Sequence, residues 1–231
     1  MIEVELKFAL PMGAQAQLQA LLTAMPLTRQ LEQSGATDTY YDTAAFDCLQ
    51  QAVFIRIRNH AYLEIKYHEQ ADPAHTHSLE RVFPLDATSS LVKEMNSLCA
   101  RFISGWQPAE TIEDSLHTNG LVPFVHIEKQ RTRYEYKHIT LCLDHVKGLG
   151  DFFEVETACT EETEVPGAQA ELQDFVARLA CPDLRPVRIG YVELWLRLHL
   201  PHIYRLGKYQ EEHTLEPRFK SAGGIGLSQQ A

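Results

Sequence analysis

The stretch Glu3-Val4-Glu5-Leu6-Lys7 opens the chain with charged and apolar residues in strict alternation. Side chains of an extended strand point alternately to opposite faces, so this stretch presents one charged face and one apolar face. A single strand of this kind is typical of a sheet with one solvated side. The same pattern recurs along the chain, however, and the recurrence favours a more specific interpretation.

Charged residues occupy alternate positions in several later β-prone stretches. Residues 53–58 carry Arg56 and Arg58, and an Asn59-His60 turn leads into residues 62–67. The stretches with charged or polar faces are 62–67 with Glu64 and Lys66, 78–84 with Glu80, 124–136 with Lys129, Arg131 and Arg133, 139–146 with Cys142 and Asp144, and 152–158 with Glu154 and Glu156. About eight strands are therefore expected, each with one charged face.

Apolar residues at helical spacing separate these strands. They predict amphipathic helices over 14–25, 91–102, 168–179 and 190–200, and a weaker helix within 106–122. The stretch Asp38-Thr-Tyr-Tyr-Asp-Thr43 is also β-prone. We expect a single domain over residues 1–205 and a flexible tail over 206–231, where the composition becomes polar and rich in glycine.

Closing the sheet into a barrel would turn alternate residues of each strand into the lumen. The helices need an apolar partner, which places the apolar strand faces outside and the charged faces inside. Lys and Arg side chains in such a tunnel would bind phosphate oxygens, and paired carboxylates would supply ligands for Mg²⁺ or Mn²⁺. This combination predicts phosphoryl or nucleotidyl transfer.

Composition limits the alternatives. The formal net charge of −10 argues against a nucleic-acid-binding protein, which needs a surplus of cations. The five cysteines show no CxxC spacing and are odd in number, so neither a disulfide framework nor a zinc cluster is indicated. No apolar run approaches ~20 residues and no signal peptide is expected, so we predict a cytoplasmic protein without a membrane segment.

The order of these motifs resembles the CYTH superfamily, the triphosphate tunnel metalloenzymes, over residues 1 to about 205. The motifs that carry the resemblance are Glu3-Val-Glu5-Leu-Lys7, Arg56-Ile-Arg58, Glu64-Ile-Lys66, Lys129-Gln-Arg131, Asp144 and Glu154-Val-Glu156. The resemblance implies an α+β fold in which a closed eight-stranded antiparallel barrel forms a tunnel. It also implies a small-molecule triphosphate substrate and a divalent metal cofactor, Mg²⁺ or Mn²⁺.

The resemblance assigns roles to individual residues. The metal ligands it implies are Glu3, Glu5, Asp144, Glu154 and Glu156. The substrate-binding residues it implies are Lys7, Phe54, Arg56, Arg58, Lys66, Lys129, Arg131 and Arg188. The stretch from Asp38 to Arg58 is similar to thiamine triphosphatases, in which the first tyrosine of the YYD run pairs with the catalytic lysine. These catalytic positions are Tyr40 and Lys66 here.

Thiamine triphosphate, inorganic triphosphate and related organic triphosphates all remain candidate substrates. An aromatic residue before the paired arginines stacks on thiamine in the related enzymes, and Phe54 stands where animal enzymes have tryptophan. A class IV adenylate cyclase is a second hypothesis. Its HFxG-type extension ahead of the first strand is not found here, which favours hydrolysis. A non-catalytic polyphosphate-binding module is a third hypothesis, but it would have no use for paired carboxylates.

Overall fold

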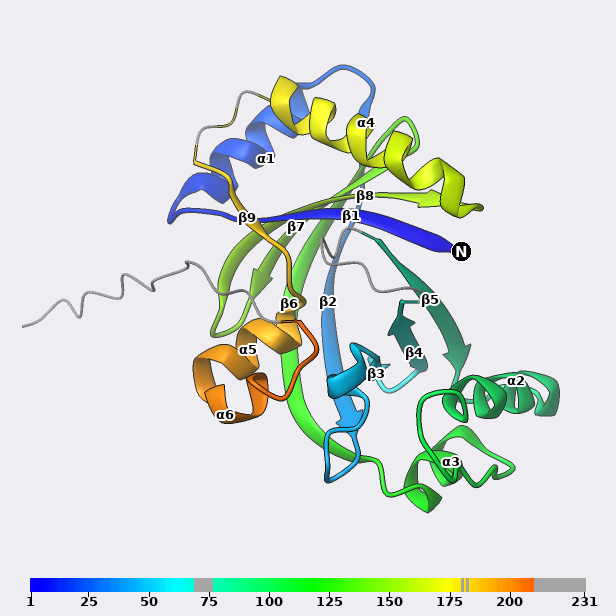
Figure 1. Cartoon of the computed structure of the whole chain (residues 1–231). Helices are drawn as coiled ribbons and strands as arrows, with labels where there is room; N and C mark the ends of the chain where they lie inside the picture. The colour runs from blue at the N-terminus through cyan, green and yellow to red at the C-terminus, as the bar shows by residue number, and fades with distance from the viewer. Residues whose placement is uncertain (69–76, 180, 182, 210–231) are drawn as a thin grey trace, which may run out of the picture.

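A computed structural model describes residues 1–68, 77–179, 181 and 183–209. Its strands form one antiparallel sheet in the order β5-β4-β3-β2-β6-β7-β8-β1-β9 (Figure 1). A further pairing of β1 with β5, with Glu3 opposite Ser78, joins the two sides of the sheet. The structure therefore confirms the closed eight-stranded barrel, with β9 added beside β1.

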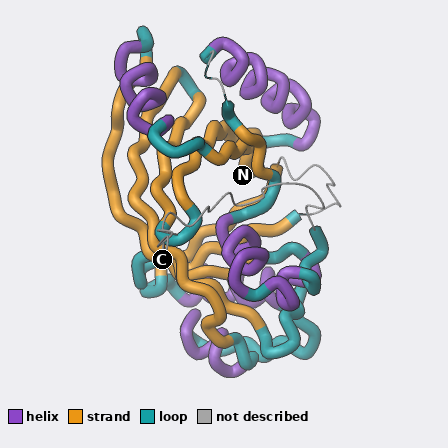
Figure 2. The backbone as a smooth tube through the Cα atoms, turned by 90° about the vertical axis from the view of Figure 1, so that its left-hand side faces the viewer, coloured by secondary structure: helices purple, strands orange, loops and turns teal. Residues whose placement is uncertain are grey.

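The strands differ widely in length. They are β1 Ile2–Ala9, β2 Thr28–Asp42, β3 Phe54–Arg58, β4 Tyr62–Tyr67, β5 His77–Pro84, β6 Val122–Tyr136, β7 Ile139–Val146, β8 Gly150–Cys159 and β9 Arg185–Val187. The helices are α1 Ala14–Ala24, α2 Ser89–Cys99, α3 Ile112–Thr118, α4 Val165–Arg178, α5 Tyr191–His199 and α6 Pro201–Tyr204. The strands curve around a common interior (Figure 2).

Two hydrophobic clusters cover the outside of the barrel. In the first, α1 and α4 pack on β1, β7 and β8, with Leu22 and Phe175 buried against Val4 and Val155. In the second, α2 and α3 pack on β3, β4 and β5. Burial of each large aliphatic or aromatic side chain contributes about 1.5–3 kcal/mol, so these clusters supply much of the stabilisation. The apolar strand faces thus point outward, as the sequence predicts.

Helix α5 packs against the interior face at one end of the barrel. Phe152 precedes Glu154 by two residues and so shares its inward face, and its ring lies 5.0 Å from the Tyr191 ring of α5. Val146 and Ile127 belong to the same buried cluster. The helix therefore covers this end and places Tyr191 next to the charged interior.

Strand β2 is much longer than the sequence predicts. Only Asp38–Thr43 has a clear β pattern, yet β2 begins at Thr28 and pairs with β6 over its length. Most of its first half is exposed, so no apolar residue needs to recur there with period two. The three-residue strand β9 was also missed, since it is too short to show alternation.

The hairpin turns match their predicted positions. Asn59 and His60 both have positive φ in the turn between β3 and β4, where the Ala61 N–H donates to the Arg58 carbonyl at 3.0 Å. Gly148 and Gly150, both also at positive φ, connect β7 to β8. Residues 210–231, most of the predicted tail, lie outside the described residues. None of the described helices combines the length and apolar character needed to cross a membrane.

Candidate functional site

The barrel interior contains a cavity of about 600 Å³. Strands β1–β6 and β8 and the start of α5 line it. Its charged lining residues are Glu3, Glu5, Lys7, Glu32, Arg56, Arg58, Glu64, Lys66, Glu80, Lys129, Arg131, Arg133, Glu154 and Glu156. Carboxylates and cations are equal in number in this set, so the described lining is nearly neutral when all of these groups are ionised.

Four carboxylates gather where β1 pairs with β8. The antiparallel register sets Glu5 opposite Glu156. Glu154 lies two residues before Glu156 on β8 and shares its inward face. Glu3 lies two residues before Glu5 and completes the group. Burial and the nearby Glu3 carboxylate raise the pKa of Glu156 to about 8. Burial and the neighbouring carboxylate therefore disfavour the charged form of Glu156.

Two lysines contact this carboxylate group. Lys66 donates to Glu3 at 2.8 Å and to Glu5 at 3.2 Å, and its ammonium lowers the pKa of Glu3 to about 2. Burial opposes the charge on Lys66, but Glu3 and Glu5 outweigh it and raise its pKa well above the usual value. Lys7 lies 2.8 Å from Glu5 and 3.2 Å from Glu154. Lys66 is therefore protonated at neutral pH.

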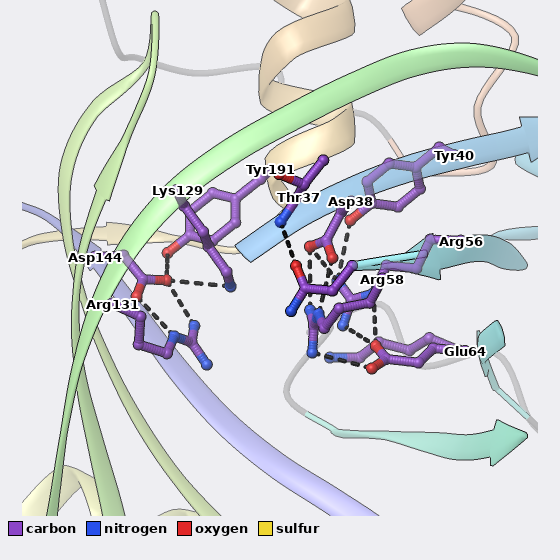
Figure 3. A network of polar contacts seen from close by, with 12 residues as sticks. Thr37, Asp38, Tyr40, Arg56, Arg58, Glu64, Lys129, Arg131, Asp144 and Tyr191 are labelled. Atoms are coloured by element: carbon purple, nitrogen blue, oxygen red, sulfur yellow. Dashed lines mark hydrogen bonds and ion pairs between the residues drawn. The ribbon is translucent and has the colours of Figure 1, made fainter. Parts of the chain in front are cut away.

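A second charged group lies on β2, β3 and β4. Arg58 Nε donates to Asp38 at 2.8 Å, and Arg56 Nε donates to Glu64 at 2.7 Å (Figure 3). Burial disfavours the Asp38 carboxylate, but Arg56 and Arg58 outweigh it and lower its pKa to about 2. Asp38 is 1% exposed and does not line the cavity. It contacts both guanidinium groups from beneath the cavity surface.

Asp144 plays a similar structural part on β7. It accepts hydrogen bonds from Arg131 at 2.7 and 2.6 Å, from Lys129 at 3.4 Å and from the Tyr191 hydroxyl at 3.0 Å (Figure 3). The side chain is fully buried and lies outside the cavity lining, unlike the four glutamates. Its role as a metal ligand stays a prediction, whereas its contacts with the two cations are present in the structure.

Tyr40 and Lys66, which lie in the described part of the chain, do not form the predicted contact with each other. Tyr40 lies opposite Arg56 in the β2–β3 register, and its hydroxyl accepts from Arg56 at 3.1 Å. Lys66 instead reaches past β5 to Glu3 and Glu5 on β1. The expected pair is therefore replaced by two separate contacts, because register and reach bring each side chain to another partner.

Phe54 and Arg188 lie at the side of the cavity near β9 and α5. A smaller cavity of about 80 Å³ is lined by Phe54, Lys7, Lys66 and Arg188, among others. The first three of these also line the main cavity, so the two spaces are adjacent. Arg188 is exposed and does not line the main cavity. The structure thus groups every predicted lining residue except Asp144 and Arg188 around the main cavity.

Sequence reasoning missed the parts played by Asp38 and Tyr191. The Tyr191 ring lies 4.8 Å from Lys7 Nζ and 5.2 Å from Lys129 Nζ, in cation–π geometry. Its helical spacing assigns Tyr191 to the apolar stripe of α5. Nothing in the sequence pattern indicates that its hydroxyl contacts a charged residue. Asp38 could have been found, since it lies two residues before Tyr40 and so shares its inward face.

The geometry defines a class: an antiparallel tunnel protein with an ionic interior. The family model of the CYTH domain matches residues 1–191, and the chain therefore belongs to the CYTH domain family. No curated protein matches the sequence significantly.

Solved structures show the same fold. The PH1819 protein from Pyrococcus horikoshii OT3 superimposes with a TM-score of 0.62 at 23% identity, over 85% of this chain and 99% of that one. A putative adenylyl cyclase from Hippeastrum, HpAC1, described as having a dominant triphosphatase activity, gives a TM-score of 0.54 at 19% identity over 92% and 99% of the two chains. A putative adenylate cyclase from Vibrio parahaemolyticus gives 0.56 at 16% identity over 84% and 98%.

Proposed function

We propose that this chain is a divalent-metal-dependent triphosphatase whose cavity binds the phosphates of a small-molecule triphosphate. The observation that carries the proposal is the arrangement of charge in the cavity. The carboxylates of β1 and β8 gather on one part of the wall, while Arg56, Arg58 and Arg131 approach from β3 and β6. Guanidinium groups bind phosphate oxygens in a bidentate manner, and grouped carboxylates bind hard cations.

The charge balance supports a metal requirement. Because the described lining is nearly neutral by itself, a triphosphate would bring several negative charges that the protein does not offset. Bound divalent cations would restore the balance. A binding module without metal would have to expel its own carboxylates from the phosphate site, so the arrangement favours the metal-dependent enzyme.

The residues present fit a divalent cation. Oxygen atoms of Glu154 and Glu156 lie within 4.8 Å of each other and of the Cys142 sulfur, and Glu3 and Glu5 adjoin them on β1. Oxygen donors of this kind suit Mg²⁺ or Mn²⁺. We propose that these four glutamates hold the metal. When bound, it supplies charge neutralisation to phosphate oxygens and acidifies an attacking water molecule.

The remaining residues bind and orient the substrate. Asp38 and Glu64 fix Arg56 and Arg58, and Asp144 fixes Lys129 and Arg131, so the donors are already placed before a phosphate arrives. Lys66 is protonated and contributes positive charge to the reacting phosphoryl group. Burial raises the pKa of Tyr40, which therefore keeps its proton and can orient Arg56.

We place the organic part of the substrate beside Phe54. This ring is half-buried and lines both the main cavity and the adjacent smaller one, where Arg188 also lies. An aromatic face there suits a cationic ring such as that of thiamine. Thiamine triphosphate is the first candidate substrate, followed by inorganic triphosphate and related organic triphosphates.

A substrate panel tests the proposal. The purified protein is incubated with thiamine triphosphate, inorganic triphosphate, ATP and GTP, each with Mg²⁺ or Mn²⁺, and the products are separated by chromatography. We expect orthophosphate and the corresponding diphosphate. Cyclic AMP as the main product would identify a cyclase. Tight calorimetric binding of triphosphate without any turnover would identify a binding module.

A further inference from the structure

Three cations follow one another on the inward face of β6. Lys129, Arg131 and Arg133 alternate along the strand, and the exposure of their side chains rises from 4% to 19% to 43%. The row therefore runs from the buried end near Tyr191 toward the open end of the cavity. Arg133 lies two residues beyond Arg131, which Asp144 holds together with Lys129.

Arg133 differs from the other lining cations in its contacts. Each of the others in the described chain has a carboxylate oxygen no farther than 3.4 Å. The nearest such contact of Arg133 is Glu32 at 4.0 Å, and both side chains are more than two-fifths exposed. Its buried Nε has no hydrogen-bond partner. Among the lining cations of the described chain, Arg133 is thus the one with the weakest carboxylate pairing.

A neutral polar residue lines the cavity next to this row of cations. Ser34 on β2 lies opposite Arg131, two register pairs from Glu32 and Arg133 and on the same inward face. The hydroxyl and the guanidinium together offer hydrogen-bond donors to one anionic group.

We propose that Arg133 and Ser34 form an additional phosphate position at the open end of the cavity, beyond the triphosphate clamp. The inference rests on the proposed function and extends its substrate class. Two residues along a strand advance by about 7 Å, so a phosphate chain lying along β6 reaches Arg133 after leaving Arg131. The ligand is a phosphate group, either the fourth phosphoryl of a longer linear polyphosphate or released orthophosphate.

Steady-state kinetics on the full chain with Mg²⁺ test this position. Linear tripolyphosphate and tetrapolyphosphate are compared as substrates, and orthophosphate is added as an inhibitor. The variants are Arg133→Gln, Arg133→Lys and the matched control Arg29→Gln. Arg29 lies on the partner strand β2, pairs with Glu135 at 2.7 Å and does not line the cavity. Its loss should change none of the measurements.

The two sources of phosphate give different results. If the position holds a fourth phosphoryl group, Arg133→Gln raises KM for tetrapolyphosphate about tenfold and leaves tripolyphosphate nearly unchanged. If it holds the product, the inhibition constant for orthophosphate rises by about the same factor. Arg133→Lys keeps the charge but loses the planar fork, so its effect should be smaller.

Unchanged constants for all three ligands, or an equal rise for tripolyphosphate and tetrapolyphosphate, would overturn the inference. Failure of the proposed function gives a separate signature. In that case the wild-type protein neither binds tripolyphosphate in calorimetry nor hydrolyses it. Normal tripolyphosphate turnover together with an inert Arg133 would overturn only the additional position.

Discussion

Two parts of the cavity wall place opposite charges together in different ways. Around β2 and β3, the carboxylates lie behind or beside the arginines, and Asp38 contacts both Arg56 and Arg58. Where β1 pairs with β8, carboxylates adjoin one another, and the pKa of Glu156 rises to about 8. The first arrangement is complete without a ligand and fixes donors. In the second arrangement, a bound cation would stabilise the charged form of the grouped carboxylates.

The largest expected effect comes from the carboxylate group. Glu154→Gln keeps the shape of the side chain but removes one charge from the proposed metal site. We expect triphosphate turnover to fall about a thousandfold, since the charge stabilisation provided by a bound metal amounts to several kcal/mol. Phosphate release with saturating Mg²⁺ measures the change.

Glu128→Gln is the matched control for Glu154→Gln. Glu128 is exposed on β6 and contacts Lys147 at the surface, outside the cavity. Circular dichroism of both variants should match the wild type. Equal turnover by Glu154→Gln and wild type would show that β1 and β8 do not form the metal-binding part of the wall.

The arginine group should respond through stability as well as activity. Asp38→Asn removes the carboxylate that Arg56 and Arg58 share and leaves Glu64 as their remaining buried counter-charge. Breaking a buried ion pair costs about 3–5 kcal/mol. We expect the free energy of unfolding in urea to fall by about 3 kcal/mol. Asp86→Asn, at an exposed carboxylate, is the control and should leave it unchanged. A stable Asp38→Asn protein would show that the arginines do not depend on Asp38.

The contacts of Asp38 with Arg56 and Arg58 also predict a pH dependence of stability. The pKa of Asp38 is about 2 in the folded chain, below the value of about 3.9 in an unfolded chain. The unfolded state therefore takes up the proton first, and the contribution of Asp38 is present above pH 4 and lost as the pH falls toward 2. The stability difference between wild type and Asp38→Asn should shrink by about 2–3 kcal/mol over this range. A difference that is constant with pH would contradict the assignment.

Phe54 should have the smallest effect, because it belongs to neither charged group. Phe54→Ala should lower kcat/KM for thiamine triphosphate about tenfold, since stacking on a cationic ring contributes roughly 1–2 kcal/mol. Inorganic triphosphate, which has no ring, should be hydrolysed nearly as before. Equal losses for both substrates would mean that Phe54 shapes the cavity without contacting the organic group.

Much of this architecture could be predicted from the sequence because the barrel has its apolar strand faces outside, under the helices, and its charged faces inside. Alternation in Glu3–Lys7 and at Arg56 and Arg58 is strict, since one face meets helices and the other meets charge. The first half of β2 has no such signal, because most of its side chains are exposed. Tyr191 was hidden for the opposite reason, since its ring packs as part of the apolar face of α5 while its hydroxyl reaches Asp144.

Partner choice within the charged interior was harder to predict. The alternation shows that Tyr40, Lys66 and Asp144 all face inward, but it does not determine which of the inward-facing side chains contact one another. Those contacts depend on strand register and on the reach of each side chain. Register places Tyr40 opposite Arg56 and Asp144 opposite Arg131.

Metal dependence of triphosphate hydrolysis tests the central claim most directly. The protein is freed of metal with EDTA and dialysed, and phosphate release from thiamine triphosphate and inorganic triphosphate is then followed during titration with Mg²⁺ or Mn²⁺. We predict no turnover before the titration and saturable recovery during it, because the grouped glutamates need a cation before phosphate can approach. Full turnover of either triphosphate in EDTA would contradict the account.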